Sequence, residues 1–389
     1  MVSQSQKRKI LITTDLYATN TNGVVTSIQN LFDELTAKGH DVRILTISGD
    51  IHSHKEGAVY YVRSLPLGMV YPNVRMPASL PNNKWIQELI DWKPDVIHSQ
   101  CEFFSFQFAT RISRATGAPI IHTYHTLYEQ YVTYLVPSKR LGHYLVRLLS
   151  RERLRKVKTV VAPTAKVEHA LQSYGVHNPI QIVPSGISLE QHYRRLSPEE
   201  RARKRRQLGI REDQQVMLNL GRLGTEKNLG ELMAFFAEAL RSNEALVFLI
   251  VGDGPAKEDL ERQARELGVA DHVIFTGMVD PSQVQNYYQL ADVFVSASTS
   301  ETQGLTYIEA AANGLPLLCR QDDCLADVLK DGENGYEYAS AQEFLQAMHQ
   351  VMGDPKWREA ASKRSEEIAA GFEKKAFGSA MESVYESVL

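Results

Sequence analysis

Short apolar segments alternate with longer stretches of helical periodicity along the first half of the chain. In 24–38, for example, Val24, Ile28 and Leu31 fall on one stripe, and Gly39 is a plausible end of the helix. The apolar segments are short, rich in β-branched residues and bounded by turn residues, which is typical of buried strands. They predict strands at 9–14, 42–47, 59–65, 95–100, 120–123, 159–163 and 180–184.

The same alternation restarts after a polar, arginine-rich break at 194–207. It predicts strands at 216–220, 246–251, 273–276, 293–297 and 315–319, and helices at 229–241, 256–267, 281–290, 305–313 and 341–352. Two such series indicate two doubly wound α/β domains with parallel sheets, facing a central cleft. We place the domains at 1–186 and 187–371, and expect a C-terminal helix at 372–389 that crosses back to the first domain.

Composition agrees with two soluble domains. The chain has 389 residues, 43% of them hydrophobic and 23% charged, enough for two cores of ordinary size. Three cysteines are too few for a disulfide framework, which favours a reducing, cytoplasmic compartment. We see neither a signal peptide nor an apolar run of about 18 residues that would span a membrane.

Charge is divided unevenly along the chain. Residues 1–206 carry a net charge of +12 and the remainder −15, although the total is only −3. A basic half of this kind suggests a polyanion, a phosphate-rich ligand or an anionic membrane, unless the charge is merely scattered over a solvated surface.

Three segments that follow predicted strands carry candidate chemistry. Gly23 stands where a helix begins and can present backbone N–H groups to an anion, although it also suits an ordinary turn. Arg222 and Lys227 lie in a short loop before a helix and are suited to neutralise a diphosphate, unless they are simply solvated. Glu301 and Glu309 flank Gly304; a helix from about Thr302 would separate the two carboxylates by roughly two turns, to hold both ends of one elongated ligand. The alternative is a capping carboxylate and a solvated helix glutamate, which would explain either residue alone.

Together these segments resemble the retaining glycosyltransferases of family 4, which have the GT-B fold. The motifs that carry the resemblance occur in the family's order and spacing over essentially the whole chain. They are Pro184–Ile187, Gly221-Arg222 with Lys227, Gly252–Pro255, Phe275 with Gly277, and Glu301 with Glu309.

The resemblance implies a role for each matching position. Arg222 and Lys227 match the pair that binds the diphosphate of a nucleotide sugar, while Glu309 matches the carboxylate on the ribose and Glu301 the one on the sugar. His125 matches a histidine near the reacting edge of the sugar, and we favour a sugar contact over a general base. The backbone positions that match are Gly23 (phosphates), Gly304, Leu305 and Thr306 (sugar and phosphate), and Met278 (base).

The implied reaction is the departure of a nucleoside diphosphate from the anomeric carbon. Arg222, Lys227 and helix N-termini would stabilise the leaving group, so we expect no cofactor and no required metal ion. No carboxylate is securely placed as a nucleophile, which favours attack on the same face of the sugar. Two departures from the family pattern are Asn22 before Gly23, where many members have Gly-Gly, and Ser188, where the linker often has Asp.

The family does not set the acceptor, and the basic half of the chain is the part that bears on it. Segment 139–158 has eight basic residues, one acid and an apolar stripe, as in a helix that lies on a membrane surface; the alternative is a core helix with a basic outer face. The arginines at 194–206 would add to attraction by an anionic membrane. Nucleic acid is a poorer explanation, because no binding module accompanies the charge.

Upstream of that segment, an aromatic stretch with Tyr128 and Tyr131 is placed to line an acceptor path, although buried packing explains tyrosines equally well. This stretch and the loops at 14–27 and 304–309 look like the bacterial glucosyltransferases that act on diacylglycerol. We therefore expect transfer of glucose from UDP-glucose to diacylglycerol by a cytoplasmic, peripheral membrane enzyme. A soluble family member with a sugar or sugar-phosphate acceptor and a non-catalytic nucleotide-sugar binder remain the alternatives.

Overall fold

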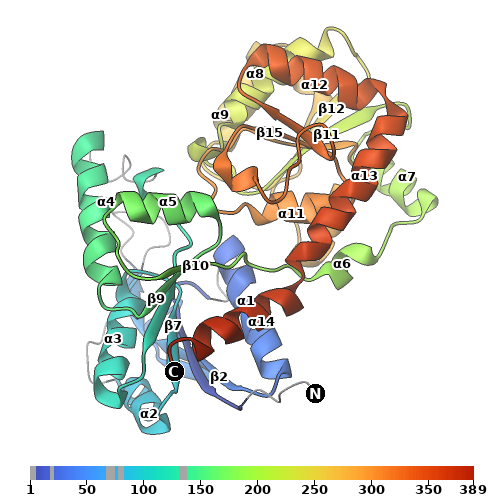
Figure 1. Ribbon diagram of the computed structural model, residues 1–389. Helices are drawn as coiled ribbons and strands as arrows, with labels where there is room; N and C mark the ends of the chain where they lie inside the picture. The colour runs from blue at the N-terminus through green and yellow to red at the C-terminus, as the bar shows by residue number, and fades with distance from the viewer. Residues whose placement is uncertain (1–5, 18–21, 67–74, 78–82, 131–137) are drawn as a thin grey trace. The chain divides into compact units, whose positions relative to one another are not determined.

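The computed structural model describes residues 6–17, 22–66, 75–77, 83–130 and 138–389. The chain forms two compact units (Figure 1). The N-terminal unit comprises Met1–Gly186 with Lys374–Leu389, and the C-terminal unit comprises Ile187–Glu373.

The N-terminal unit is built on an eight-stranded sheet in the order β10-β9-β8-β7-β1-β2-β4-β3. All neighbours are parallel except the antiparallel edge strand β3. The strands are β1 (Lys9–Thr13), β2 (Asp41–Ile47), β3 (His54–Glu56), β4 (Val59–Val62), β7 (Val96–Ser99), β8 (Ile120–Thr123), β9 (Thr159–Ala162) and β10 (Ile180–Ile182).

Helices cover both faces of this sheet. On β1, Ile10 and Ile12 face one core and Leu11 faces the other, as the two-residue period of a strand requires. The first core is covered by α1 (Gly23–Ala37) and α14 (Lys374–Glu386), which lie side by side. The second core includes side chains of α2 (Lys84–Trp92), α3 (Phe104–Thr116), α4 (Lys139–Leu154) and α5 (Ala165–Ser173).

The C-terminal unit has a six-stranded, fully parallel sheet in the order β13-β12-β11-β14-β15-β16. In chain order this is 3-2-1-4-5-6, the doubly wound arrangement in which ligands bind beyond the carboxyl ends of the strands. The strands are β11 (Gln215–Leu220), β12 (Leu246–Val251), β13 (Val273–Phe275), β14 (Val293–Ser296), β15 (Leu317–Arg320) and β16 (Gly335–Tyr338).

The C-terminal unit also has helices on both faces of its sheet. They are α6 (Leu189–Tyr193), α7 (Pro198–Gln207), α8 (Leu229–Leu240), α9 (Lys257–Glu266), α10 (Val284–Tyr288), α11 (Leu305–Ala312), α12 (Ala341–Gly353) and α13 (Pro355–Ala369). The stretch interpreted as an arginine-rich break therefore contains a helix, α7. Ser197 and Glu200 form a capping box and Pro198 follows the cap. This pattern predicts the start of a helix, although the many arginines of the segment suggested a polar break.

The expected strand at 59–65 is wrong as a single element. It breaks at Arg63, whose N–H donates to the Ser53 hydroxyl, and continues as β5 (Ser64–Pro66). Strand β5 pairs with β6 (Arg75–Pro77) in a separate two-stranded sheet.

Candidate active site

Glycine-rich loops bring three of the predicted motifs together at the carboxyl ends of β11, β12 and β13. The N–H of Leu223 donates to the carbonyl of Asp253 (2.9 Å), and the N–H of Gly252 donates to that of Gly277 (3.1 Å). A Cβ on Gly252 would lie 1.9 Å from the carbonyl oxygen of Gly221, so only glycine permits this approach. The loops form one edge, at the place where a doubly wound sheet binds its ligand.

Both predicted diphosphate-binding side chains lie at this edge. Arg222 follows β11 and pairs with the largely buried carboxylate of Glu226, while Lys227 pairs with Glu301. In this state each cation is therefore partly neutralised by a carboxylate. A diphosphate that binds here would replace those carboxylates as the partner of the cations.

Glu301 does not lie on a helix, contrary to the expectation that one begins near Thr302. Helix α11 begins at Leu305, because Gly304 adopts a left-handed conformation (φ 75°) that breaks the helix before it. A Cβ on Gly304 would also lie 2.5 Å from the ring of Tyr307. Glu301 thus belongs to the loop after β14, and the partly buried Leu305 and Thr306 form the first turn of α11.

Glu309 lies on α11 with one carboxylate oxygen already bound. The hydroxyl of Tyr288, a fully buried residue that the sequence analysis did not select, donates to Oε2 of Glu309 at 2.7 Å. Burial raises the pKa of Glu309 to about 7, and the Tyr288 hydrogen bond partly offsets this. The sequence of the predicted helix at 281–290 does not indicate that Tyr288 contacts Glu309, because this contact depends on how α10 and α11 pack.

Met278, the predicted base-binding position, follows β13 and is 71% exposed.

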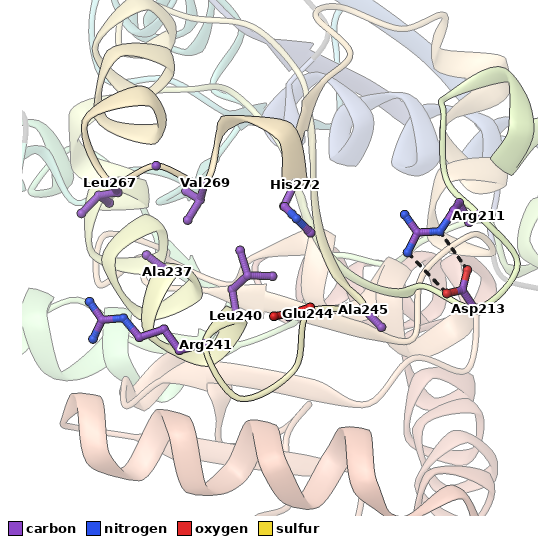
Figure 2. Close-up of a pocket in the computed structure, with 11 residues that line it drawn as sticks. Arg211, Asp213, Ala237, Leu240, Arg241, Glu244, Ala245, Leu267, Val269 and His272 are labelled. Atoms are coloured by element: carbon purple, nitrogen blue, oxygen red, sulfur yellow. Dashed lines mark hydrogen bonds and ion pairs between the residues drawn. The ribbon is translucent and has the colours of Figure 1, made fainter.

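A separate cavity of about 730 Å³ lies in the same unit and is shown in Figure 2. Its lining includes Arg211, Ala245 and His272, which precede β11, β12 and β13. The cavity therefore lies at the amino ends of these strands, at the edge of the sheet opposite to the predicted donor residues.

In the N-terminal unit, Gly23 is the first residue of α1. Oδ1 of Asn22 accepts a hydrogen bond from the N–H of Val25 (3.0 Å), so Asn22 is the N-cap of this helix. The departure from Gly-Gly thus places a capping side chain beside Gly23, and this cap occupies one of the helix N–H groups.

His125 follows β8 and is held by Gln100, which follows β7. Nε2 of His125 lies 2.6 Å from Oε1 of Gln100, an acceptor, so this ring nitrogen is the donor. Burial, and then the nearby His122, lower the pKa of His125 to about 3. The imidazole is neutral at physiological pH and too weakly basic for efficient proton abstraction, which fits a sugar contact better than a general base.

Tyr128 belongs to a buried network beside His125. Its hydroxyl donates to Oε2 of Glu102 (2.6 Å), while Nε2 of His122 lies 3.1 Å from Oε1 of the same carboxylate. The ring of Phe103, which is 43% exposed, meets the edge of Tyr128 at a centroid distance of 5.2 Å. Glu102 and Phe103 were not selected from the sequence, and Tyr131 lies outside the described residues.

Helix α4 exposes most of the apolar stripe that the sequence predicted. The exposed fractions are 50% for Leu141, 62% for Tyr144, 44% for Leu145 and 39% for Leu149. The face toward the sheet consists of other residues, among them Val146 and Ser150, whose hydroxyl bonds that of Tyr124. Helix α4 therefore packs on the core through these other residues, and its outer face carries both basic side chains and most of the apolar stripe.

The second basic cluster, at 194–206, is only partly a surface cluster. It belongs to the C-terminal unit, where Arg205 is buried and donates to the carbonyl of Leu290 (3.1 Å). Arg201 donates to the carbonyl of Gln289 and Arg195 to that of Asn313. Arg205 is therefore a structural residue of the unit, while Arg194, Arg203 and Arg206 remain exposed.

Within the described ranges, no group of three or more His, Cys, Asp or Glu side chains is placed to hold a metal ion. Independence of a metal remains a prediction for an assay. None of the helices in the part of the chain that the structure describes is long and apolar enough to cross a membrane.

Comparison with known proteins agrees with this arrangement. Residues 21–191 match the family described as Glycosyltransferase Family 4, and residues 200–368 match the family described as Glycosyl transferases group 1. The alpha-monoglucosyldiacylglycerol synthase of Streptococcus pneumoniae is 34% identical over 346 residues, covering 88% of this chain and 78% of the relative. That of Acholeplasma laidlawii is 29% identical over 389 residues, covering 97% and 96%.

Among solved structures, Anabaena Alr3699/HepE in complex with UDP and glucose superposes with a TM-score of 0.76 at 16% identity, covering 98% of this chain and all of the other. Such a likeness shows the fold, which is GT-B, as expected from the motifs. With the two family matches and the streptococcal relative, it leads to one conclusion: this chain belongs to the family 4 glycosyltransferases and is a hexosyltransferase that uses a nucleotide sugar.

Proposed function

We propose that the protein transfers glucose from UDP-glucose to diacylglycerol, with retention of configuration, at the cytoplasmic surface of a membrane. The relatives from S. pneumoniae and A. laidlawii are named for such a product, and the structural neighbour holds UDP and glucose. The exposed apolar and basic face of α4 is the observation that carries the choice of a lipid acceptor.

The donor would bind at the loop edge of the C-terminal unit. Arg222 and Lys227 supply two positive charges for the diphosphate, and Glu309 carries a second carboxylate oxygen, Oε1, besides the one bound by Tyr288. Glu301 lies beside Lys227, as required of a carboxylate that holds the sugar next to the phosphates. Binding of this kind places the anomeric carbon near the leaving group's counter-ions.

The chemistry then follows from charge. The bond between the anomeric carbon and the phosphate oxygen breaks as the bond to the acceptor hydroxyl oxygen forms on the same face of the sugar. The acceptor proton passes to the leaving phosphate oxygen, so no protein base is needed. Arg222 and Lys227 stabilise the charge that develops on the diphosphate, the term that usually contributes most to such catalysis.

Membrane contact is proposed for α4. An apolar stripe that is left exposed on a helix with exposed Arg140, Arg147 and Arg151 matches a helix that lies in the interface of an anionic membrane. Each basic residue near such a surface contributes about 1 kcal/mol of attraction, which salt weakens.

Cosedimentation with vesicles tests the membrane contact. Wild type should bind vesicles that contain an anionic lipid and should be released by salt, while Leu145→Ser should bind more weakly. Leu389→Ser is the matched control, because Leu389 is similarly exposed but lies at the C-terminus. Equal binding to anionic vesicles by wild type and Leu145→Ser would contradict the role of α4.

A transfer assay tests the reaction. Several UDP-sugars are offered against diacylglycerol in vesicles and against water-soluble sugars and sugar phosphates. Formation of an α-glucosyl lipid supports the proposal, and transfer only to a soluble acceptor would replace it with the soluble alternative. UDP binding without turnover of any donor would favour a non-catalytic nucleotide-sugar binder.

A further inference from the structure

Three side chains of the C-terminal unit, those of Asn228, Glu231 and Arg320, form a chain of polar contacts that begins next to Lys227. Its first member, Asn228, has φ 52° and is one of two non-glycine residues with positive φ among those described, the other being Lys93. Asn228 ends the 3₁₀ turn that carries Lys227 and immediately precedes α8. Its left-handed conformation, which asparagine tolerates better than most residues, thus sets how Lys227 and the N-terminus of α8 are presented.

The side chain of Asn228 is tied to two charged residues. Nδ2 of Asn228 donates to Oε2 of Glu231, and Oε1 of Glu231 pairs with the guanidinium of Arg320. Arg320 is the last residue of β15, so the chain connects the carboxyl end of a core strand to the residue after Lys227. Glu231 is 19% and Arg320 31% exposed, which protects the pair from full solvent screening.

The charges in this chain also matter for an anionic ligand. Glu231 lies in the first turn of α8, where a carboxylate suits the helix dipole. The same carboxylate would repel a diphosphate bound beside Lys227. Arg320 compensates that charge, so Glu231 can hold Asn228 without opposing the donor.

We propose that Glu231 and Arg320 are positioning residues for donor binding, acting through Asn228 on Lys227. Neither needs to touch the nucleotide sugar. The inference rests on the proposed function in one respect, since it takes Lys227 as the residue that meets the diphosphate. It predicts that residues on β15 and α8 control donor affinity while leaving acceptor affinity alone.

The test measures the affinity for UDP by calorimetry and the KM for UDP-glucose and for acceptor. Arg320→Met leaves the Glu231 carboxylate uncompensated and is expected to weaken UDP binding and raise the donor KM about tenfold, with the acceptor KM unchanged. The double variant Glu231→Gln/Arg320→Met removes the uncompensated charge and should bind UDP better than Arg320→Met. Arg364→Met, which breaks an exposed pair with Glu333 far along the chain, is the matched control and should behave as wild type.

Asn228 provides a second, independent test. Asn228→Gly keeps the left-handed backbone accessible and should weaken UDP binding only a few-fold, while Asn228→Ala also strains the backbone and should weaken it more. Unchanged UDP affinity in both Arg320→Met and Asn228→Ala would overturn the inference. Failure of the wild type to bind UDP would instead overturn the proposed donor site, and so the two failures are distinguishable.

Discussion

The two units present opposite kinds of polar site. In the C-terminal unit, Arg222, Lys227 and Glu301 are partly exposed on short loops and pair with opposite charges. In the N-terminal unit, Glu102 and His122 are buried and His125 is kept neutral by burial. Loops with exposed charge suit a charged ligand that exchanges ion-pair partners, whereas a buried hydrogen-bonded network suits a hydroxyl acceptor.

The net charge of each unit is opposite to what the charge of its proposed ligand would suggest. The N-terminal unit contains 23 basic and 15 acidic residues, and the C-terminal unit 20 and 31. The unit proposed to bind the anionic donor is therefore the acidic one. The proposed donor site therefore depends on two local cations, Arg222 and Lys227, whereas the net charge of a unit reflects its outer surface, such as the basic face of α4.

The largest expected effect tests the charged loops. Lys227→Ala should reduce kcat for transfer about 100-fold or more, because the proposed role of Lys227 is to stabilise the leaving diphosphate. Steady-state transfer from labelled UDP-glucose measures it. Lys363→Ala, which removes an exposed lysine paired with Glu359, should leave kcat unchanged, and a similar loss in both variants would refute a specific role for Lys227.

Substitution of Glu309 is expected to weaken donor binding while it increases the stability of the fold. Glu309→Gln should raise the donor KM about tenfold at pH 8, since it removes the negative charge and replaces one of the two acceptor oxygens by an NH₂ donor. Burial raises the pKa of Glu309 to about 7 in the folded state, so its ionisation reduces stability as the pH rises from about 4.5 to 7.

The same variant should therefore be more heat-stable than wild type at pH 8 and closer to it at pH 5. Donor KM and Tm measured at both pH values check the two expectations together. A donor KM equal to that of wild type would remove Glu309 from the ribose site.

Tyr288→Phe tests the same carboxylate, with a smaller expected effect on donor binding. Its hydroxyl stabilises the ionised form of Glu309, so Tyr288→Phe should raise the pKa of Glu309 further. The pH at which donor KM improves should shift upward by a fraction of a pH unit to about one unit. Tyr338→Phe, which loses a bond to a backbone carbonyl instead, is the control and should keep the wild-type midpoint.

A hydrogen bond between two buried residues of the N-terminal unit, Tyr385 and His98, should contribute mainly to stability. The hydroxyl of Tyr385 on α14 lies 2.8 Å from Nδ1 of His98, and both residues are buried. Tyr385→Phe leaves that nitrogen unpaired and should cost about 1 kcal/mol, lowering Tm by about 2–4 °C. Differential scanning calorimetry measures it, with the exposed Tyr144→Phe as control. A Tm that does not change would show that α14 does not depend on this bond.

Most of the strands and the position of the donor motifs were predictable from the sequence, because each is a local signal. A run such as Leu246–Val251 must be buried on both faces, and glycines such as Gly252 mark the turn that follows it. The basic, amphipathic character of 139–154 was equally local. The sequence therefore determined the fold class, the family and the edge of the sheet where the predicted donor-binding residues lie.

Tertiary structure decided what each of these signals meant. Whether the stripe of α4 is core or surface depends on which of its faces the sheet covers, and periodicity alone does not distinguish the two. The arginines at 201 and 205 looked like free charge but bind carbonyls, since only the folded unit shows which backbone groups lie near them. Tyr288 on Glu309 and Arg320 behind Asn228 join residues far apart in the chain, and such contacts are set by packing rather than by any pattern along it.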